Sequence, residues 1–255
     1  MKIAVVNSDR RMQEVYFQLA REEEAILINE FTDFEKIDQI DALVLPIKGL
    51  TATGSLYSSG KELQIPAYFW DSVHDIPIFT GIRQAFLKDF PNVYYYMEDE
   101  AMKQRNAVYT AEGTLYLMMD HTAKSIKELC VDVIGYGLCG KEIVKWLQEL
   151  HIPYRVIRRQ CVEDEIFLSV ANYRKVSCHE VIINTSVAKV IDKELLESWQ
   201  IKPLIIDIAT PDVIDYAAAV RLGIRVIKAG NLPEMVAYES SGKSISEFVR
   251  GKLHC

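Results

Sequence analysis

The sequence lacks long apolar runs and clustered positive charge. A membrane span needs about 20 consecutive apolar residues, and the opening apolar run already ends at Val6. We therefore expect neither a signal peptide nor contact with a membrane. The formal net charge is −7 over 255 residues, without the stripe of Lys and Arg that a phosphate backbone requires. Nucleic acid is thus not expected as a partner.

Cysteine pairing is also missing. The five cysteines form no C-x-x-C pair and are odd in number: Cys130, Cys139, Cys161, Cys178 and Cys255. This pattern is typical of reduced thiols and predicts a cytoplasmic protein. Cys178 and His179 are adjacent in sequence and are residue types that bind zinc, but no further Cys or His follows at the spacing of a zinc site. We expect no metal.

The chain contains two passages in which apolar strands alternate with helical stretches. Such alternation predicts an α/β protein with two doubly wound domains built on parallel sheets. In the first passage we expect a helix over 11–22 and strands over 2–6, 25–28, 42–45, 66–69, 77–79 and 93–96. In the second we expect strands over 131–134, 154–157, 181–184, 204–208 and 225–227, and helices over 140–150, 193–199 and 211–222, with Gly223 ending the last helix.

A helical connector separates the two passages. Thr110 suits an N-cap position, so we expect a buried helix over 110–121. Another helix is predicted over 244–253, where it could pack back on the first domain. We therefore expect one domain from 1–108 with 236–255, and a dinucleotide-binding domain over 109–235. The second β-α unit, between Arg159 and Val181, is short and predicts no regular helix.

One glycine-rich loop, Gly135-Tyr136-Gly137-Leu138-Cys139-Gly140, follows an apolar strand and opens an amphipathic helix. In this context G-x-G-x-x-G predicts a Rossmann unit. The first glycine permits the tight turn, the second lets the backbone approach a pyrophosphate, and the third lets the helix pack on the sheet. The free N–H groups and the helix dipole then face the anion. The alternative is a glycine-rich turn that binds nothing.

The end of the second predicted strand decides between NAD and NADP. NAD-binding units usually place a carboxylate there for the ribose diol, but this chain has Arg158 and Arg159. Two guanidinium groups suit a 2′-phosphate, so we favour NADP over NAD. The alternative is that both arginines are solvated surface charges.

Several short passages, in the same order, resemble the A subunit of dipicolinate synthase, an enzyme of spore-forming bacteria. Each passage is short, so the resemblance depends on their order over nearly the whole chain. They are the start around Asp9 and Arg11, residues 78–82, residues 106–121 with their Thr-Ala-Glu-Gly core, the glycine loop, residues 183–185, and the tail from Gly230 to Gly242.

This resemblance implies a flavodoxin-like N-terminal domain beside a Rossmann domain, with substrate in the cleft. It implies NADP-linked oxidation of dihydrodipicolinate, or a hydrated precursor, to dipicolinate during sporulation. A flavoprotein-like B subunit would be a partner, the substrate would be a small dicarboxylate, and we expect a homo-oligomer. The implied substrate-binding residues are Asp9, Arg11, Thr80 and Asn106; Glu112 or His121 would be the base; Asn184 and Thr185 would join the glycine loop in binding the cofactor.

The chain departs from the family pattern at several positions. The most consequential is Glu239, which replaces a lysine, because a carboxylate there should repel a dianionic substrate. Two alternatives therefore stay open: a dehydrogenase of another small amino, imino or hydroxy acid, and a cofactor-binding regulatory subunit without turnover. The other departures are Tyr109, Val187, the shortened loop at Pro211, Glu234 and Tyr238.

Overall fold

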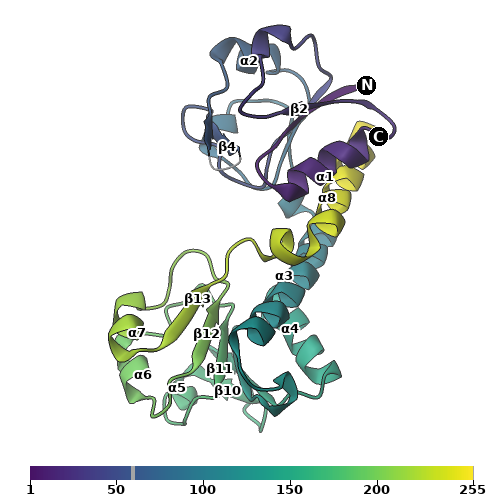
Figure 1. Ribbon diagram of the computed structural model, residues 1–255. Helices are drawn as coiled ribbons and strands as arrows, with labels where there is room; N and C mark the ends of the chain where they lie inside the picture. The colour runs from purple at the N-terminus through teal and green to yellow at the C-terminus, as the bar shows by residue number, and fades with distance from the viewer. Residues whose placement is uncertain (59–60, 255) are drawn as a thin grey trace. The chain divides into compact units, whose positions relative to one another are not determined.

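The computed structural model describes residues 1–58 and 61–254, and Figure 1 labels its elements. The chain divides into two compact units, Met1–Asn106 with Ala237–Cys255 and Ala107–Val236. We call these the first and the second unit. None of the described helices combines the length and the apolarity that a membrane span requires.

The first unit is built on a sheet of five strands in the order β2-β1-β3-β6-β7. All neighbouring strands pair in parallel. With the intervening hairpin left out, this order is the 2-1-3-4-5 order of flavodoxin-like folds, which confirms the predicted fold of this part of the chain. The strands are β1 (Lys2–Val6), β2 (Glu24–Ile28), β3 (Ala42–Val44), β6 (Ile78–Thr80) and β7 (Val93–Tyr95).

Helices cover both faces of this sheet. On one face, α1 (Arg10–Leu19) and the later part of α8 (Leu232–Leu253) enclose a core that includes Ile3, Met12 and Val249. The two helices lie side by side (Figure 1). They approach closely at Gly242 of α8, where a Cβ would come 2.7 Å from the Arg11 carbonyl oxygen of α1. The other face packs against α2 (Ala67–Ser72) and a hairpin of β4 (Leu56–Ser58) and β5 (Lys61–Leu63). Short 3₁₀ helices η1 (Phe34–Lys36), η2 (Ala85–Leu87) and η3 (Tyr96–Glu98) connect the elements.

One strand predicted for the first unit is wrong. The segment 66–69 lies at the start of α2, where Pro66 occupies the N-cap. Phe69 and Trp70 are buried in the core, and so short an apolar segment carries no period that separates a strand from a buried helix. The β4–β5 hairpin was not predicted, and the helix predicted over 11–22 already ends at Leu19.

The second unit contains a sheet of six strands in the order β10-β9-β8-β11-β12-β13, again all parallel. This is the 3-2-1-4-5-6 order of the Rossmann fold, so the predicted fold class is confirmed here too. All five predicted strands are present, and β10 is an addition. The strands are β8 (Val131–Ile134), β9 (Tyr154–Arg158), β10 (Phe167–Ser169), β11 (Val181–Asn184), β12 (Leu204–Asp207) and β13 (Arg225–Lys228).

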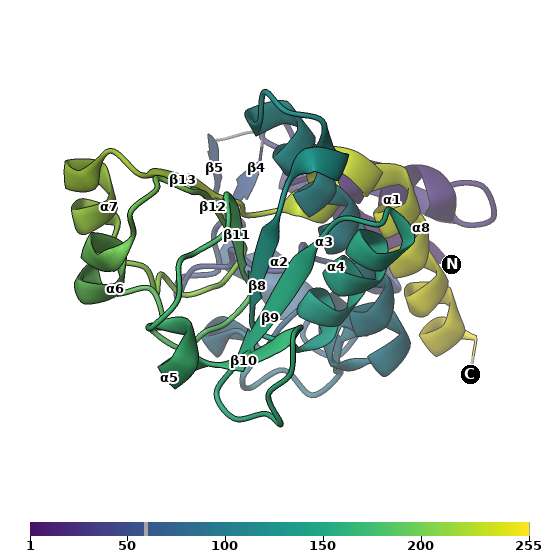
Figure 2. The same ribbon diagram turned by 90° about the horizontal axis from the view of Figure 1, so that it is seen from below.

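Figure 2 shows helices on both faces of this second sheet. On one face, α4 (Leu138–Glu149) and the later half of α3 (Glu100–His121) share a core that includes Met118 and Ile143. On the other face lie α5 (Val170–Tyr173), α6 (Lys193–Ser198) and α7 (Tyr216–Leu222). A 3₁₀ turn, η4 (Ile126–Glu128), precedes β8.

Helix boundaries account for most of the remaining differences. Thr110 is not an N-cap, because α3 begins at Glu100 and the Asp99 carboxylate accepts a hydrogen bond from the Met102 N–H. Helix α7 begins after the capping residue Asp215 rather than at Pro211. It ends at Gly223 in the left-handed conformation, as predicted. Helix α8 begins at Leu232, with non-helical backbone angles at Ala237. The short second β-α unit retains only one turn of helix, α5.

Candidate functional site

Two glycines of the predicted loop are required by the packing between β8 and α4. Gly135 has a φ of +100°, which L side chains rarely adopt, and a Cβ there would clash with Thr185 Oγ1. A Cβ on Gly140 would clash with the Gly135 carbonyl oxygen. The first glycine therefore permits the turn and the third permits the close approach of the helix, which are the roles that the motif predicts.

Gly137 has a different role. It is the N-cap residue of α4, and no side chain of the described residues caps this helix end. A Cβ on Gly137 would have no atom within 4 Å, so the fold itself does not require a glycine here. The helix therefore begins with backbone N–H groups and a positive dipole end that no side chain neutralises, which is an arrangement suited to a phosphate.

The strand next to β8 holds this loop in place. Thr185 donates hydrogen bonds from its N–H and its hydroxyl to the Ile134 carbonyl oxygen, at 2.8 and 3.1 Å. Asn184 is buried and donates from Nδ2 to Asp207 Oδ1 at 2.8 Å. The Tyr216 hydroxyl donates to the other oxygen of Asp207 at 2.6 Å. Asn184 and Thr185 were predicted to bind the cofactor. In the structure, Thr185 packs against Gly135 of the loop, and Asn184 is held by Asp207.

Asp207 and Tyr216 were not predicted from the sequence. A signal was present, since Asp207 ends an apolar strand and lies in register with Asn184 at the end of the next strand. Ligands of doubly wound sheets bind outside the carboxyl ends of the strands, so the polar residue that ends each strand is a candidate for the site.

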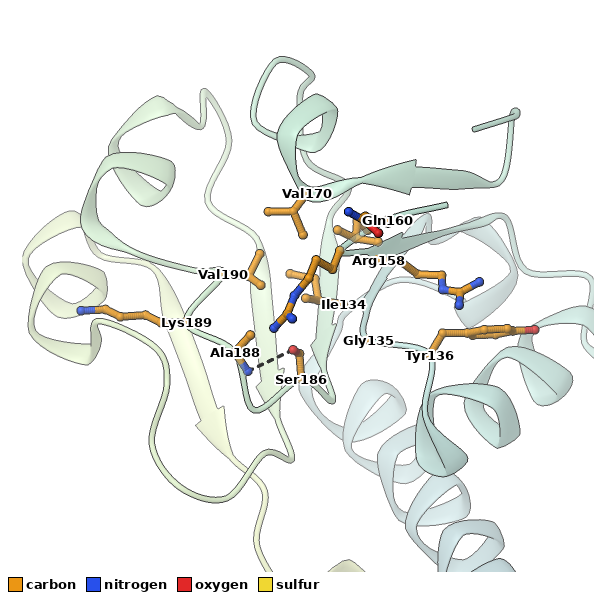
Figure 3. Close-up of a pocket in the computed structure, with 12 residues that line it drawn as sticks. Ile134, Gly135, Tyr136, Arg158, Gln160, Val170, Ser186, Ala188, Lys189 and Val190 are labelled. Carbon is orange, nitrogen blue, oxygen red and sulfur yellow. Dashed lines mark hydrogen bonds between the residues drawn. The ribbon is translucent and has the colours of Figure 1, made fainter. Parts of the chain in front are cut away.

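A cavity of about 580 Å³ opens beside the glycine loop. It lies between the loop, the end of β9 and the segment after β11, and Figure 3 shows side chains from all three. The size falls within the usual range of small-molecule sites. Its walls are formed by Ile134, Gly135, Tyr136, Ile157, Arg158, Arg159, Gln160, Val170, Ser186, Ala188, Lys189 and Val190.

The lining of this cavity includes three cationic residues and no carboxylate. Arg158 and Arg159 are exposed, and neither forms an ion pair within residues 1–58 and 61–254. The nearest acids along the chain are occupied in shaping their own loop: Glu163 accepts hydrogen bonds from Ser169 and Asn172. Asp164 accepts hydrogen bonds from the backbone N–H groups of residues 166 and 167. The charge at the end of β9 is therefore positive.

Cys139 lies in the glycine loop, partly buried at the first turn of α4. Burial raises the pKa of its thiol, and a hydrogen bond with Thr110 of α3 offsets this effect only in part. The neighbouring carboxylate of Glu142 raises the pKa further. Cys139 is thus a small packing residue at neutral pH rather than a reactive thiol.

We expect Cys139 to react slowly with iodoacetamide at pH 7, because only the thiolate is nucleophilic and the raised pKa keeps it scarce. Peptide mass spectrometry after timed labelling would follow the site, with free cysteine as the reference for an unperturbed thiol. Labelling of Cys139 faster than the reference would contradict this expectation.

In the first unit, Asp9 and Arg11 bind each other. Asp9 caps α1 by accepting hydrogen bonds from the backbone N–H groups of Arg11 and Met12. Its carboxylate also binds the Arg11 guanidinium through Nε at 3.3 Å and Nη2 at 2.7 Å. Thr80 is fully buried, and its hydroxyl donates to the Pro46 carbonyl oxygen at 2.9 Å. These predicted substrate residues thus all have local structural partners.

The remaining predicted residues lie along α3. Asn106 is half-buried and one turn before Thr110, the residue that contacts Cys139. Glu112 is also half-buried, and burial raises the pKa of its carboxyl group. His121 lies at the far end of the helix, where Arg225 Nη2 lies 2.8 Å from its Nδ1. Arg225 begins β13, so the structure places His121 at the amino end of that strand rather than beside the glycine loop.

A buried charge cluster in the second unit was also missed. Asp132 of β8 is fully buried and binds the Arg155 guanidinium through two hydrogen bonds of 2.8 and 3.0 Å. It also accepts hydrogen bonds from the Tyr173 hydroxyl and the His179 N–H. Burial opposes ionisation, but the bonds from His179 and Arg155 outweigh it and lower the pKa of Asp132. Within the described residues, no three His, Cys, Asp or Glu side chains are grouped to hold a metal ion.

With the geometry established, the chain can be compared with known proteins. No protein-family model matches it. It is 26% identical to the A subunit of dipicolinate synthase from Bacillus subtilis (strain 168), over 98% of this chain and 94% of that protein. The chain is thus similar to that synthase subunit over nearly its whole length. The resemblance predicted from short motifs is thereby confirmed.

Solved structures of the dipicolinate synthase A subunit have the same fold. The protein from Bacillus halodurans superposes with a TM-score of 0.85 at 20% identity, covering 99% of this chain and 97% of the other. The Bacillus subtilis protein superposes with a TM-score of 0.82 at 23% identity, covering 100% and 96%.

Dehydrogenases share the fold at lower similarity. A formate dehydrogenase from Staphylococcus aureus in complex with NAD has a TM-score of 0.58 at 12% identity, covering 100% and 95%. A glyoxylate/hydroxypyruvate reductase from Sinorhizobium meliloti in complex with NADP and malonate has a TM-score of 0.54 at 14% identity, covering 97% and 91%.

Proposed function

We propose that this chain is an NAD(P)-dependent oxidoreductase that binds the cofactor's pyrophosphate at the amino end of α4. The observation that carries the proposal is the uncapped helix end behind Gly137, beside a cavity of about 580 Å³. The fold neighbours that bind NAD or NADP support the same function. The residues present fit such a group, since the loop offers N–H donors and the cavity walls offer apolar and cationic side chains.

We further propose NADP rather than NAD as the cofactor. Arg158 and Arg159 stand where a carboxylate would hold the ribose diol of NAD. Guanidinium groups bind phosphate through paired, charge-assisted hydrogen bonds. Glu163 and Asp164 are engaged within their own loop, and no carboxylate lines the cavity beside the arginines.

For the substrate we propose dihydrodipicolinate, or a hydrated precursor, oxidised to dipicolinate as the relative's name suggests. Dihydrodipicolinate loses a hydride and a proton as its ring becomes aromatic, a hydrated precursor also loses one water, and a bound nicotinamide dinucleotide would supply the hydride acceptor. Arg11 is the cation we propose for a substrate carboxylate; its side chain is buried and is held by Asp9 through Nε and Nη2. Asn106 would add a hydrogen bond, and the buried Thr80 would support the surrounding backbone.

Glu112 is the base we propose. Burial raises the pKa of its carboxyl group, which brings a carboxylate closer to the basicity that proton abstraction at neutral pH needs. His121 is the weaker candidate, because it binds Arg225 at the amino end of β13, whereas ligands of such sheets bind at the carboxyl ends.

The pH dependence of turnover tests this assignment. A base must be deprotonated to act, so kcat should rise with pH through the raised pKa of Glu112 and fall below it. In Glu112→Gln this rising limb should disappear from the residual activity, whereas His121→Gln should keep it. A rising limb that persists in Glu112→Gln and vanishes in His121→Gln would move the role to His121.

One observation favours a second candidate function. Glu239 is exposed, and its carboxylate accepts a hydrogen bond from the Tyr238 hydroxyl. The Tyr238 ring in turn lies 4.3 Å from the Arg10 guanidinium. A carboxylate in place of the family's lysine suits a substrate with less negative charge. The alternative is therefore a dehydrogenase of another small amino, imino or hydroxy acid.

A thermal-shift and turnover series would test the proposal as a whole. A ligand that binds only the folded state raises Tm, so NADPH should raise it more than NADH. Reduction of NADP by dihydrodipicolinate would then support the first function, and reduction by other small acids alone would support the second. Cofactor binding without any turnover would point to a regulatory role, and absence of binding would overturn the proposal.

A protein partner and a role in sporulation are part of the same proposal. The relative is named as one subunit of a synthase, and for this chain we propose a flavoprotein-like B subunit together with self-association. Co-purification of the two chains, and light scattering on this chain alone, would separate a mixed complex from a homo-oligomer.

A further inference from the structure

The aromatic ring of Tyr136, between the first two glycines of the loop, lies beside side chains from three other elements. Its centroid lies 5.4 Å from that of Phe167 in β10, with the ring planes at 80°. The Arg158 guanidinium, at the end of β9, lies 5.5 Å from the same centroid, and Figure 3 shows this side chain beside the ring. Lys141 Nζ, from the first turn of α4, lies 5.9 Å away. The Tyr136 ring thus has two cationic side chains and one aromatic ring as neighbours.

This ring is the partner that the structure records for the Arg158 guanidinium. The side chain is exposed and forms no ion pair within the described part of the chain. A free arginine side chain has many rotamers, and ordering it on binding costs conformational entropy. An aromatic face attracts a cation weakly at exposed sites, which is enough to favour one side-chain position without neutralising the charge as a carboxylate would.

The packing of Tyr136 indicates that its ring, and not its hydroxyl, is the functional part. The residue is only half-buried, so the fold does not need it as a central core residue. No hydrogen bond of its hydroxyl is recorded among residues 1–58 and 61–254, whereas its ring has three neighbours. Phe167, in the strand β10, contacts Tyr136 edge to face and limits its rotation.

We propose that Tyr136 is a positioning residue that sets the preference for NADP by holding the Arg158 guanidinium at the ribose 2′-phosphate. This proposal rests on the proposed function, and it assigns a role to the residue between the first two glycines of the loop. Phe167 contacts the Tyr136 ring edge to face. Through this contact the short strand β10 takes part in cofactor selection. Lys141 adds positive charge on the same side of the loop.

The test compares the dissociation constants of NADPH and NADH by fluorescence titration. Tyr136→Leu should raise the Kd for NADPH about two- to fivefold, as expected for loss of one exposed cation–π contact, and leave the Kd for NADH unchanged. Tyr136→Phe keeps the ring and should leave both values unchanged. Phe167→Leu should shift the ratio in the same direction by less. It also serves as the second variant should Tyr136→Leu fail to fold.

A double-mutant comparison sharpens the result. In an Arg158→Ala background, Tyr136→Leu should cost NADPH no further affinity, because the side chain it positions is gone. An equal loss for both cofactors, an unchanged NADPH-to-NADH ratio, or additive effects with Arg158→Ala would each overturn the inference. If the unmodified protein binds neither cofactor, or does not prefer NADPH, the proposed function or its cofactor fails first. If it prefers NADPH and Tyr136→Leu keeps the full preference, only this inference fails.

Discussion

Replacing Gly137 by valine is expected to leave the fold intact and to remove dinucleotide binding. A Cβ at this position would have no atom within 4 Å, and the residue has a φ of −80°, which valine adopts without strain. The added side chain would instead occupy the approach to the uncapped N–H groups of α4. Each charge-assisted hydrogen bond lost is worth about 1.5–3 kcal/mol, so losing two should weaken binding about 100-fold or more.

The controls for this prediction come from the same loop. Leu138→Ala removes an exposed side chain but keeps every backbone N–H, so it should bind as the unmodified protein does. Gly140→Val should behave in the opposite way and lower Tm, because its Cβ would clash with the Gly135 carbonyl oxygen. Titration with NADPH and circular-dichroism melting would measure both properties. Tight binding of NADPH by Gly137→Val would show that the phosphate does not bind at this helix end.

Replacing Arg158 by aspartate is expected to reverse the cofactor preference. The change removes a cation and adds an anion at the end of β9, where the cavity lining holds no other carboxylate. Losing a paired hydrogen bond to phosphate costs about 3 kcal/mol, and like-charge repulsion adds to this. NADPH should therefore bind about 100-fold more weakly, whereas NADH should bind as well or better, because a carboxylate can accept hydrogen bonds from the ribose diol.

An equal change of charge elsewhere provides the control. Arg221 is exposed on α7 and does not line the cavity, so Arg221→Asp should leave both dissociation constants within about twofold, since exposed charges are screened over about 10 Å. The measurement is isothermal titration of each variant with both cofactors. If Arg158→Asp weakens NADPH and NADH equally, the guanidinium does not bind the 2′-phosphate.

The second unit was predictable from local sequence because its signals are short and repeated. Val131–Ile134 has three apolar residues of four and is followed by Gly135, and Val181–Asn184 begins with three apolar residues before Asn184; fully buried parallel strands have this mostly apolar character. The glycine loop adds a motif whose three glycines lie within six residues. Arg158 could be located because the distance from the loop to the end of the second strand is similar in all such units.

What the sequence could not predict depends on residues far apart in the chain. Asp132 meets the Tyr173 hydroxyl across 41 positions, and Asn184 meets Asp207 across 23. Pattern and propensity describe neighbours, so the end of an apolar strand marks Asp207 as a candidate polar residue, but neither hydrogen-bonded pair can be predicted as a pair. The segment 66–69 failed for another reason: the three residues after Pro66 fit a strand and a buried helix equally well, and only the packing of Phe69 and Trp70 into the core decides between them.

The first unit is assembled from both ends of the chain, whereas the second is one uninterrupted stretch. Ile245 and Val249 of α8 complete the same core as Ile3 and Val5 of β1. During synthesis, every residue of the second unit is therefore made before the later part of α8, which completes the core of the first unit.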